Sequence, residues 1–235
     1  MVHLTPQHPY LTLRIKFKKV GSLQYISHLD LVRTMHKIII RSKLPLWYTE
    51  GFNPKPKMIF AAPLSIGTES MCEFMDLRLI DDIPAEEAMT RLNSNMTDEM
   101  QVLEAYYTEE KMTELKWLSY SIEIKTDNAS ADLADQCAKT LLSESVFVTK
   151  KAKPREEPKV VDIRPLIKSA DASFDNGIIR IDAVLSADAS SFLNPEYVIK
   201  ALKNECGILS NPDLTKEYYT IMRKEAYKGD MSLFA

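Results

Sequence analysis

The stretch LTLRIKFKKVGSLQYISHLDLVRTMHKIIIR, residues 11–41, decides the fold because the spacing of its apolar residues changes along the way. Over residues 11–20 apolar side chains occupy every second position, which predicts a half-buried strand. Ser27, followed three residues later by Asp30, fits a capping box that opens a helix. Apolar residues then recur at helical spacing until Pro45, which ends the helix. The other face of the strand is a basic outer row: Thr12, Arg14, Lys16 and Lys18.

The next elements extend this strand and helix into a larger unit. Strands are predicted at residues 58–62, 72–80 and 101–108, with a helix over 85–92 behind Pro84. The order is β-α-β-β-α-β, the ferredoxin-like arrangement. It appears again as a strand, helix and strand at 118–125, 131–142 and 146–150, and as a strand, helix and strand at 178–186, from 194, and at 218–224.

We therefore predict an α+β protein made of tandem ferredoxin-like (βαββαβ) units. The first unit covers residues 1–112 and carries the GFNPKPK loop, and the second covers 113–235. A charged insertion at 150–177 interrupts the second unit. Its first part, KKAKPREEPK at 150–159, has the composition of an exposed, mobile loop.

Composition narrows the class of protein. The 235 residues are 45% hydrophobic and 27% charged, with a formal net charge of −3. These values are typical of a globular chain and argue against a protein that coats nucleic acid by bulk charge, although local basic patches can still bind it. The three cysteines are far apart and form no metal-binding or cluster motif, which predicts no metal and no cofactor in this chain. No signal peptide or membrane span is visible, so we expect a cytoplasmic protein.

The connection at residues 47–70, WYTEGFNPKPKMIFAAPLSIGTES, contains five proline and glycine residues, which narrow or extend the range of backbone φ angles. Proline fixes φ and glycine permits positive φ, so this loop is given a definite shape. Shaped loops often bind ligands, but a rigid connector that only positions the next strand would look the same. The restricting residues are Gly51, Pro54, Pro56, Pro63 and Gly67.

Two groups of side chains suit a nucleic acid. Arg33, Lys55 and Lys57 would contact phosphate, and Tyr48 or Phe52 would stack on unpaired bases. The alternative is an ordinary solvated surface with core aromatics. The start of the first predicted helix could also hold a phosphate, because helix N-termini attract anions. Capping alone would explain two of the four residues there, which are Ser27, His28, Asp30 and Arg33.

Three carboxylates lie on or beside predicted strands: Glu73, Asp76 and Asp162. A buried aspartate could serve as a nucleophile or a general base. Pairing with Arg78 or Arg164 is the alternative, since buried carboxylates are usually partnered. The sequence assigns no catalytic residue.

Four motifs carry a family resemblance: SHLDLxR (27–33), LPLWYTEGFNPKPK (44–57), AxPLSIGTES (61–70) and DIRP (162–165). They resemble the bacterial radical-SAM-linked protein family, whose members carry a domain of unknown function beside or fused to radical SAM enzymes. The resemblance implies a radical SAM partner, which would itself hold S-adenosylmethionine and the iron–sulfur cluster. The chain departs from the family at Lys55, where a histidine is usual, and Glu73 stands at an acidic position of the family.

Residues and resemblance together predict an accessory or substrate-recognition module that works with a radical SAM enzyme and binds RNA. Two alternatives stay open. One is an RNA-modifying enzyme of the pseudouridine synthase kind that uses Asp76 or Asp162, and the other is a structural partner in an assembly. The predicted binding residues are Ser27, His28, Asp30, Arg33, Tyr48, Glu50, Gly51, Phe52, Asn53, Lys55, Lys57, Ser70, Glu73, Asp162 and Arg164.

Overall fold

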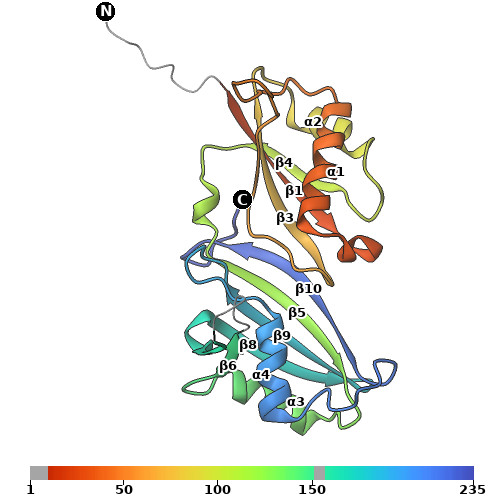
Figure 1. The fold of residues 1–235 in the computed structure, drawn as a ribbon, viewed down its shortest axis with the longest axis vertical. Helices are drawn as coiled ribbons and strands as arrows, with labels where there is room; N and C mark the ends of the chain where they lie inside the picture. The colour runs from red at the N-terminus through yellow and green to blue at the C-terminus, as the bar shows by residue number, and fades with distance from the viewer. Residues whose placement is uncertain (1–9, 151–156) are drawn as a thin grey trace, which may run out of the picture. The chain divides into compact units, whose positions relative to one another are not determined.

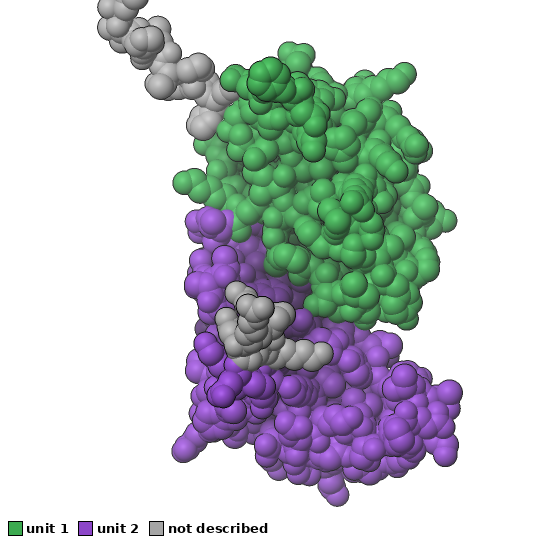
Figure 2. Space-filling view, viewed as in Figure 1, with its two compact units in different colours: residues 1–112 green, residues 113–235 purple. Residues whose placement is uncertain are grey.

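The computed structural model describes residues 10–150 and 157–235, and its secondary structure combines α-helices with antiparallel β-sheets (Figure 1). The described residues contain four α-helices. Residue contacts divide the chain into two compact units, Met1–Met112 and Thr113–Ala235 (Figure 2). None of the described helices is both long and apolar enough to cross a bilayer. Most of the expected loop at 150–159, namely 151–156, lies outside the described residues.

Unit 1 contains four strands and two α-helices. Neighbouring strands are antiparallel and follow the order β4-β1-β3-β2. The elements are β1 (Leu11–Lys19), η1 (Gly21–Tyr25), α1 (His28–Arg41), β2 (Met58–Phe60), β3 (Thr68–Leu79), α2 (Ala85–Asn93) and β4 (Val102–Tyr107), and η2 (Met112–Glu114) spans the boundary between the two units in the sequence.

One face of the unit 1 sheet carries the hydrophobic core. Three of the alternating apolar residues of β1, from Leu13 to Phe17, are fully buried and cluster with residues of both helices, whereas Leu11 at the start of the strand is 42% exposed. Removing such apolar surface from water is the main force that holds sheet and helices together. The core contributors from β1, α1 and α2 include Leu13, Ile15, Phe17, Leu31, Met35, Ala88 and Leu92.

The expectation of an exposed basic row on β1 is wrong at Arg14, whose exposed fraction is 0%. Its guanidinium donates two parallel hydrogen bonds to Asp76 on β3, from Nε to Oδ1 at 2.8 Å and from Nη2 to Oδ2 at 3.1 Å. Nη2 also donates to the Glu110 carbonyl oxygen at 2.6 Å. Alternation in the sequence indicated the face of the sheet on which Arg14 lies, but not that this face is covered at Arg14.

The longer strands of unit 2 are antiparallel to their neighbours and follow the order β10-β5-β9-β8. Strands β6 and β7 form a separate two-stranded sheet. Helices α3 and α4 pack against each other and lie on one side of the larger sheet (Figure 1). The elements are β5 (Trp117–Lys125), α3 (Ala131–Leu141), β6 (Phe147–Lys150), β7 (Lys159–Asp162), η3 (Arg164–Leu166), β8 (Ile167–Asp175), β9 (Ile178–Ser186), α4 (Glu196–Cys206) and β10 (Tyr218–Tyr227).

The expected insertion at 150–177 requires a correction. Strand β8 lies inside this range and pairs with β9 in the main sheet of unit 2. The run at 146–150, expected as a strand of that sheet, instead pairs with β7. The connection between β8 and β9 is Asn176-Gly177, with φ of 48° and 80°. An Asn-Gly pair with two positive φ angles is a strong signal for a tight hairpin, and it marks β8 in the sequence.

Candidate functional site

The loop at 47–57 folds into a small hairpin, which we call the 47–57 hairpin. Its backbone arms are joined by Thr49 N–H donating to Lys55 O at 2.9 Å and by Lys57 N–H donating to Trp47 O at 3.4 Å. The Thr49 hydroxyl also accepts from Lys55 N–H at 3.1 Å. Its first arm is fastened to β3, because Trp47 N–H donates to Arg78 O at 2.8 Å. The predicted shaped loop is thus a hydrogen-bonded projection of the sheet.

An aromatic cluster stands at the base of the 47–57 hairpin. The Arg78 guanidinium lies 3.9 Å from the Tyr10 ring centroid and 5.9 Å from that of Trp47. The two rings are themselves 5.4 Å apart. Cation–π contacts of this kind restrict the side chains involved. The base therefore holds the hairpin in place, while its tip extends away from the core.

The tip of the 47–57 hairpin is exposed. Phe52 is fully exposed, and Tyr48 is 43% exposed. Gly51 has φ of 120°, a conformation that other residues rarely adopt, and an added Cβ would meet no atom within 4 Å. Neither Lys55 nor Lys57 forms an ion pair within the described part of the chain. The exposed residues here are Glu50, Gly51, Phe52, Asn53, Lys55 and Lys57.

The start of α1 forms a separate group. Ser27 is the N-cap, since its hydroxyl oxygen accepts from Asp30 N–H at 3.1 Å. The hydroxyl also donates to the Asp30 carboxylate, and this bond is the main reason that the pKa of Asp30 lies below its usual value. Arg33 pairs with Asp30 at 3.4 Å, and His28 packs edge-on against Phe60. Capping and packing thus involve all four residues.

Two predicted binding residues on β3, Ser70 and Glu73, are buried. The Ser70 hydroxyl oxygen accepts from Cys72 N–H at 3.2 Å. Asp76, also on β3, is held by Arg14 as described above. The described residues contain no cluster of three or more histidine, cysteine or acidic side chains that could hold a metal ion.

Asp162 and Arg164 belong to unit 2, where both stabilise the β6–β7 region. Asp162 Oδ1 accepts from Val146 N–H at 2.8 Å and from Arg164 N–H at 2.9 Å. Arg164 donates to Ser143 O at 3.1 Å and to Ile167 O at 2.8 Å. The two side chains bind backbone groups, and neither bonds to the other within the described residues.

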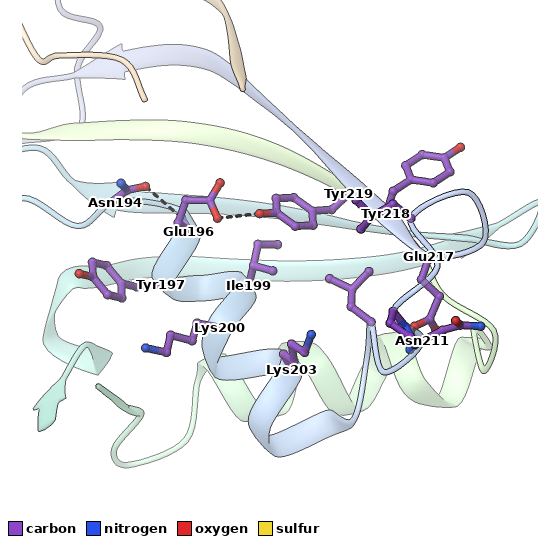
Figure 3. Close-up of a pocket in the computed structure, with 13 residues that line it drawn as sticks. Asn194, Glu196, Tyr197, Ile199, Lys200, Lys203, Asn211, Glu217, Tyr218 and Tyr219 are labelled. Atoms are coloured by element: carbon purple, nitrogen blue, oxygen red, sulfur yellow. Dashed lines mark hydrogen bonds between the residues drawn. The ribbon is translucent and has the colours of Figure 1, made fainter. Parts of the chain in front are cut away.

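The predicted residues thus fall into four places, and only the 47–57 hairpin gathers several exposed ones. Its tip combines a protruding aromatic ring with two lysines. A hollow in unit 2 beside α4 contains none of the predicted residues (Figure 3). The sequence signal for one wall of this hollow is the helical spacing of four residues on one face of α4: Glu196, Ile199, Lys200 and Lys203.

The fold and the exposed hairpin define a class, that of α+β chains with antiparallel sheets and a projecting loop. Within it, the chain belongs to the family described as uncharacterized protein conserved in bacteria (DUF2344), which matches residues 12–195. No curated protein matches the chain.

Solved structures give a likeness of fold. A chain of a Cbf5-Nop10-Gar1 complex matches with a TM-score of 0.50 at 8% identity, over 95% of this chain and 51% of that one. This chain therefore spans about half the length of that structure's chain. An unknown protein from Galdieria sulphuraria matches with a TM-score of 0.27 at 7% identity, over 91% of this chain and 98% of that one. Identities this low bear on the fold alone, and the second TM-score is too low to support any conclusion.

Proposed function

We propose that this protein is a recognition module that binds single-stranded RNA through the 47–57 hairpin and assists a radical SAM enzyme. The observation that carries the RNA part is the fully exposed Phe52 at the tip of a hydrogen-bonded hairpin, beside Lys55 and Lys57. A ring as exposed as that of Phe52 is free to contact a ligand.

The chemistry of the tip suits unpaired nucleotides. A nucleobase has a π-face that stacks on an aromatic side chain, and such stacking contributes about 1–3 kcal/mol per base. Lysine ammonium groups attract the phosphates between stacked bases. Duplex RNA would not offer its bases to Phe52, because they are already stacked within the helix. The proposal is therefore specific for single strands.

The charge of the chain bears on how strongly electrostatic attraction contributes to RNA binding. With a formal net charge of −3, binding must come from the local lysines. Each phosphate neutralised on a single strand changes the slope of log K against log salt by about −0.7, so two lysines give about −1.4. We therefore expect RNA binding to depend only weakly on salt concentration.

We further propose that each unit has the ferredoxin-like plan. The strand orders β4-β1-β3-β2 and β10-β5-β9-β8 support this, since each is the same permutation of four strands in an antiparallel sheet. In unit 2 the β6–β7 pair is then the insertion, between the first helix and the second strand of the plan. A radical SAM partner holding S-adenosylmethionine and the iron–sulfur cluster rests on the sequence motifs alone. Three buried free cysteines support a reducing, cytoplasmic setting.

The RNA part is tested by fluorescence anisotropy with a labelled 12-nucleotide oligouridylate. Phe52→Ala is expected to weaken binding about tenfold or more, because one base loses its stacking partner. Lys55→Ala with Lys57→Ala should flatten the salt dependence toward zero. Phe147→Ala, which removes another exposed phenylalanine, and Lys139→Ala with Lys224→Ala are the matched controls and should leave binding unchanged.

Binding of the wild type that is as tight to duplex as to single-stranded RNA, or an unchanged affinity in Phe52→Ala, would contradict the RNA part. The partner is tested separately by purification of the tagged protein from its native cell and mass spectrometry of what remains bound. A radical SAM enzyme among the retained proteins is the expected result, and its absence would remove that half of the proposal.

A further inference from the structure

Unit 2 contains a hollow of about 780 Å³ between α4 and the start of β10 (Figure 3). Binding sites for small molecules commonly have volumes of about 300–1,000 Å³ and combine apolar walls with a few polar groups. One wall is the face of α4 formed by Glu196, Ile199, Lys200 and Lys203. The opposite wall comes from β10, with Tyr218 and Tyr219, and from the loop before it. All of these residues belong to unit 2.

The first end of the hollow presents a carboxylate. The Tyr219 hydroxyl donates to Glu196 Oε2 at 2.7 Å, and the Asn194 side chain accepts from Glu196 N–H at 3.0 Å. Burial, followed by the nearby Glu196 carboxylate, raises the pKa of Tyr219, so its hydroxyl stays a donor. The other carboxylate oxygen of Glu196 has no hydrogen bond within the described residues. It is oriented by its neighbours and can accept from a ligand.

The second end presents a cation. Lys203 follows Glu196 by seven residues, two turns of α4 or about 10 Å along its axis. Lys203 is exposed and forms no ion pair in the part of the chain that the structure describes, although its charge is close enough to Glu217 to help lower the pKa of that carboxyl. The nearby Glu217 carboxylate is already bound by the Thr126 hydroxyl and by the backbone N–H groups of Asp127 and Asn211. Lys203 therefore keeps its hydrogen-bonding capacity for a ligand.

Between the two ends the walls are apolar and aromatic. Ile199 and Leu209 are buried, and Leu214 and Tyr218 are exposed at the rim. The aromatic rings come from Tyr197, Tyr218 and Tyr219. A ligand of this shape has hydrogen-bond donors at one end, a planar apolar middle and an anion at the other end.

We propose that the hollow binds a nucleotide with a guanine base. Guanine carries two adjacent N–H donors, at N1 and N2. One of them can bind the free oxygen of Glu196, and the other can share the oxygen that accepts from Tyr219, because each carboxylate oxygen has two lone pairs. The base would lie against the tyrosine rings, and the phosphate would bind Lys203. This inference goes beyond the proposed function, because it requires neither the 47–57 hairpin nor a radical SAM partner.

A peptide with a basic and an acidic residue matches the charges less well, since it offers no planar group for the aromatic wall. The same nucleotide chemistry could come from a free nucleotide or from a guanosine within RNA. Titration of the full chain with GMP and with a guanosine-containing tetranucleotide distinguishes these sources. Tighter binding of GMP assigns the free nucleotide, and equal or tighter binding of the tetranucleotide assigns RNA.

The test is isothermal titration calorimetry with GMP, guanosine and UMP. GMP should bind at least tenfold more tightly than UMP. Lys203→Ala should weaken GMP binding about tenfold, the loss of one charge-assisted hydrogen bond, and leave guanosine unchanged. Glu196→Gln should weaken both guanine ligands by a similar factor. Lys224→Ala, an exposed lysine of β10 outside the hollow, is the matched control and should bind GMP as the wild type does.

A second measurement protects the test against a misfolded variant. The thermal midpoint of the wild type should rise with GMP concentration, because a ligand that binds only the folded chain stabilises it. The rise should be smaller in Lys203→Ala at the same concentration. Equal affinity for GMP and UMP, or GMP affinity that neither Lys203→Ala nor Glu196→Gln reduces, would overturn the proposal.

Discussion

Arg14 is a single charged residue whose buried ion pair stabilises the fold of unit 1. Its side chain is fully buried and forms a bidentate pair with Asp76, whose side chain is 7% exposed. Removing one partner of a buried pair leaves the other charge without compensation, at a cost of about 3–5 kcal/mol. We expect Asp76→Ala to lower the free energy of unfolding by that amount, measured by urea denaturation. The same contact means that Asp76 is not a free general base in this structure.

Glu104→Ala is the control for this prediction. Glu104 is exposed on β4 and lies 3.6 Å from Lys16, on the same sheet as the buried pair. Exposed ion pairs contribute about 0–1 kcal/mol, so the control should unfold almost as the wild type does. If Asp76→Ala is no less stable than Glu104→Ala, the pair with Arg14 is not a main stabilising contact of unit 1.

Tyr106 on β4 lies opposite Arg14 and gives a prediction about alkaline pH. Burial raises the pKa of Tyr106 to about 12, although the Arg14 guanidinium opposes the shift. Between pH 10 and 12 the unfolded chain has lost a proton that the folded chain retains, so stability falls as pH rises. Tyr106→Phe removes this contribution. Its stability should therefore decline less between pH 10 and 12, measured by urea denaturation across that range.

At neutral pH the same substitution should cost little. The Tyr106 hydroxyl is buried and has no hydrogen-bond partner among the described residues. Its loss leaves no partner unsatisfied, so we expect a change within about 1 kcal/mol at pH 7. Tyr25→Phe, at an exposed tyrosine of the same unit, is the control for the loss of a hydroxyl group and should be as stable as the wild type at pH 7. If stability declines equally in Tyr106→Phe and in the wild type between pH 10 and 12, the pKa of Tyr106 is not raised by folding.

At the scale of elements, Glu217 connects three segments of unit 2 at the start of β10. Its carboxylate accepts from the Thr126 hydroxyl after β5, from Asp127 N–H at 2.8 Å, and from Asn211 N–H after α4. These bonds, that of Thr126 first, lower the pKa of Glu217 below its ordinary value. Its contribution to stability is therefore present above its unfolded pKa and is lost as pH falls through the folded value.

Glu217→Gln should make the protein less stable at pH 7, because an amide supplies fewer acceptor sites for these three donors. The difference from the wild type should shrink as pH falls below 4, when the wild-type carboxyl also takes up a proton. Thermal denaturation at both pH values measures this, and amide exchange at Asp127 and Asn211 should accelerate at pH 7. Glu205→Gln, at an exposed carboxylate of α4, should do neither.

Elements with a clear period or a start signal could be predicted from the sequence. The pattern Ser27 to Asp30 gave the start of α1, and alternation gave β1, β5 and β9. Strand β8 was not predicted, because its apolar residues are few; the Asn176-Gly177 turn is the one sequence signal that could have marked it as half of a hairpin. Periodicity also could not say which sheet the 146–150 run joins. Pairing partners are set by the tertiary fold, which a local pattern does not encode.

The candidate sites could be predicted from the sequence less fully than the helices and strands, because they depend on tertiary contacts. The sequence indicated the 47–57 loop through its prolines and glycines, but not that Phe52 would protrude from it. It grouped Arg33 with this loop, whereas the structure pairs Arg33 with Asp30 in the first turns of α1. The helical spacing on α4 indicates one wall of the hollow in unit 2 but not the hollow itself, because it forms where α4 meets residues about twenty positions later in the chain. Contacts between distant segments are set by the tertiary fold.

At the scale of the whole molecule, the two proposed sites should act independently. The 47–57 hairpin lies entirely in unit 1, and the hollow is lined only by residues of unit 2. Two sites are coupled only if one ligand changes the affinity for the other, and the effect must then be reciprocal. We expect saturating GMP to change oligouridylate affinity less than twofold, and saturating oligouridylate to change GMP affinity as little.

The substitutions provide the second half of this prediction. Lys55→Ala with Lys57→Ala should weaken oligouridylate binding and preserve GMP binding, and Lys203→Ala should do the reverse. Anisotropy and calorimetry on the same protein preparations measure both. A mutual change of about fivefold or more would correspond to a coupling free energy of about 1 kcal/mol. It would show that the hairpin and the hollow serve one ligand or one conformational change, and a single guanosine-containing RNA that contacts both would then be the ligand to test.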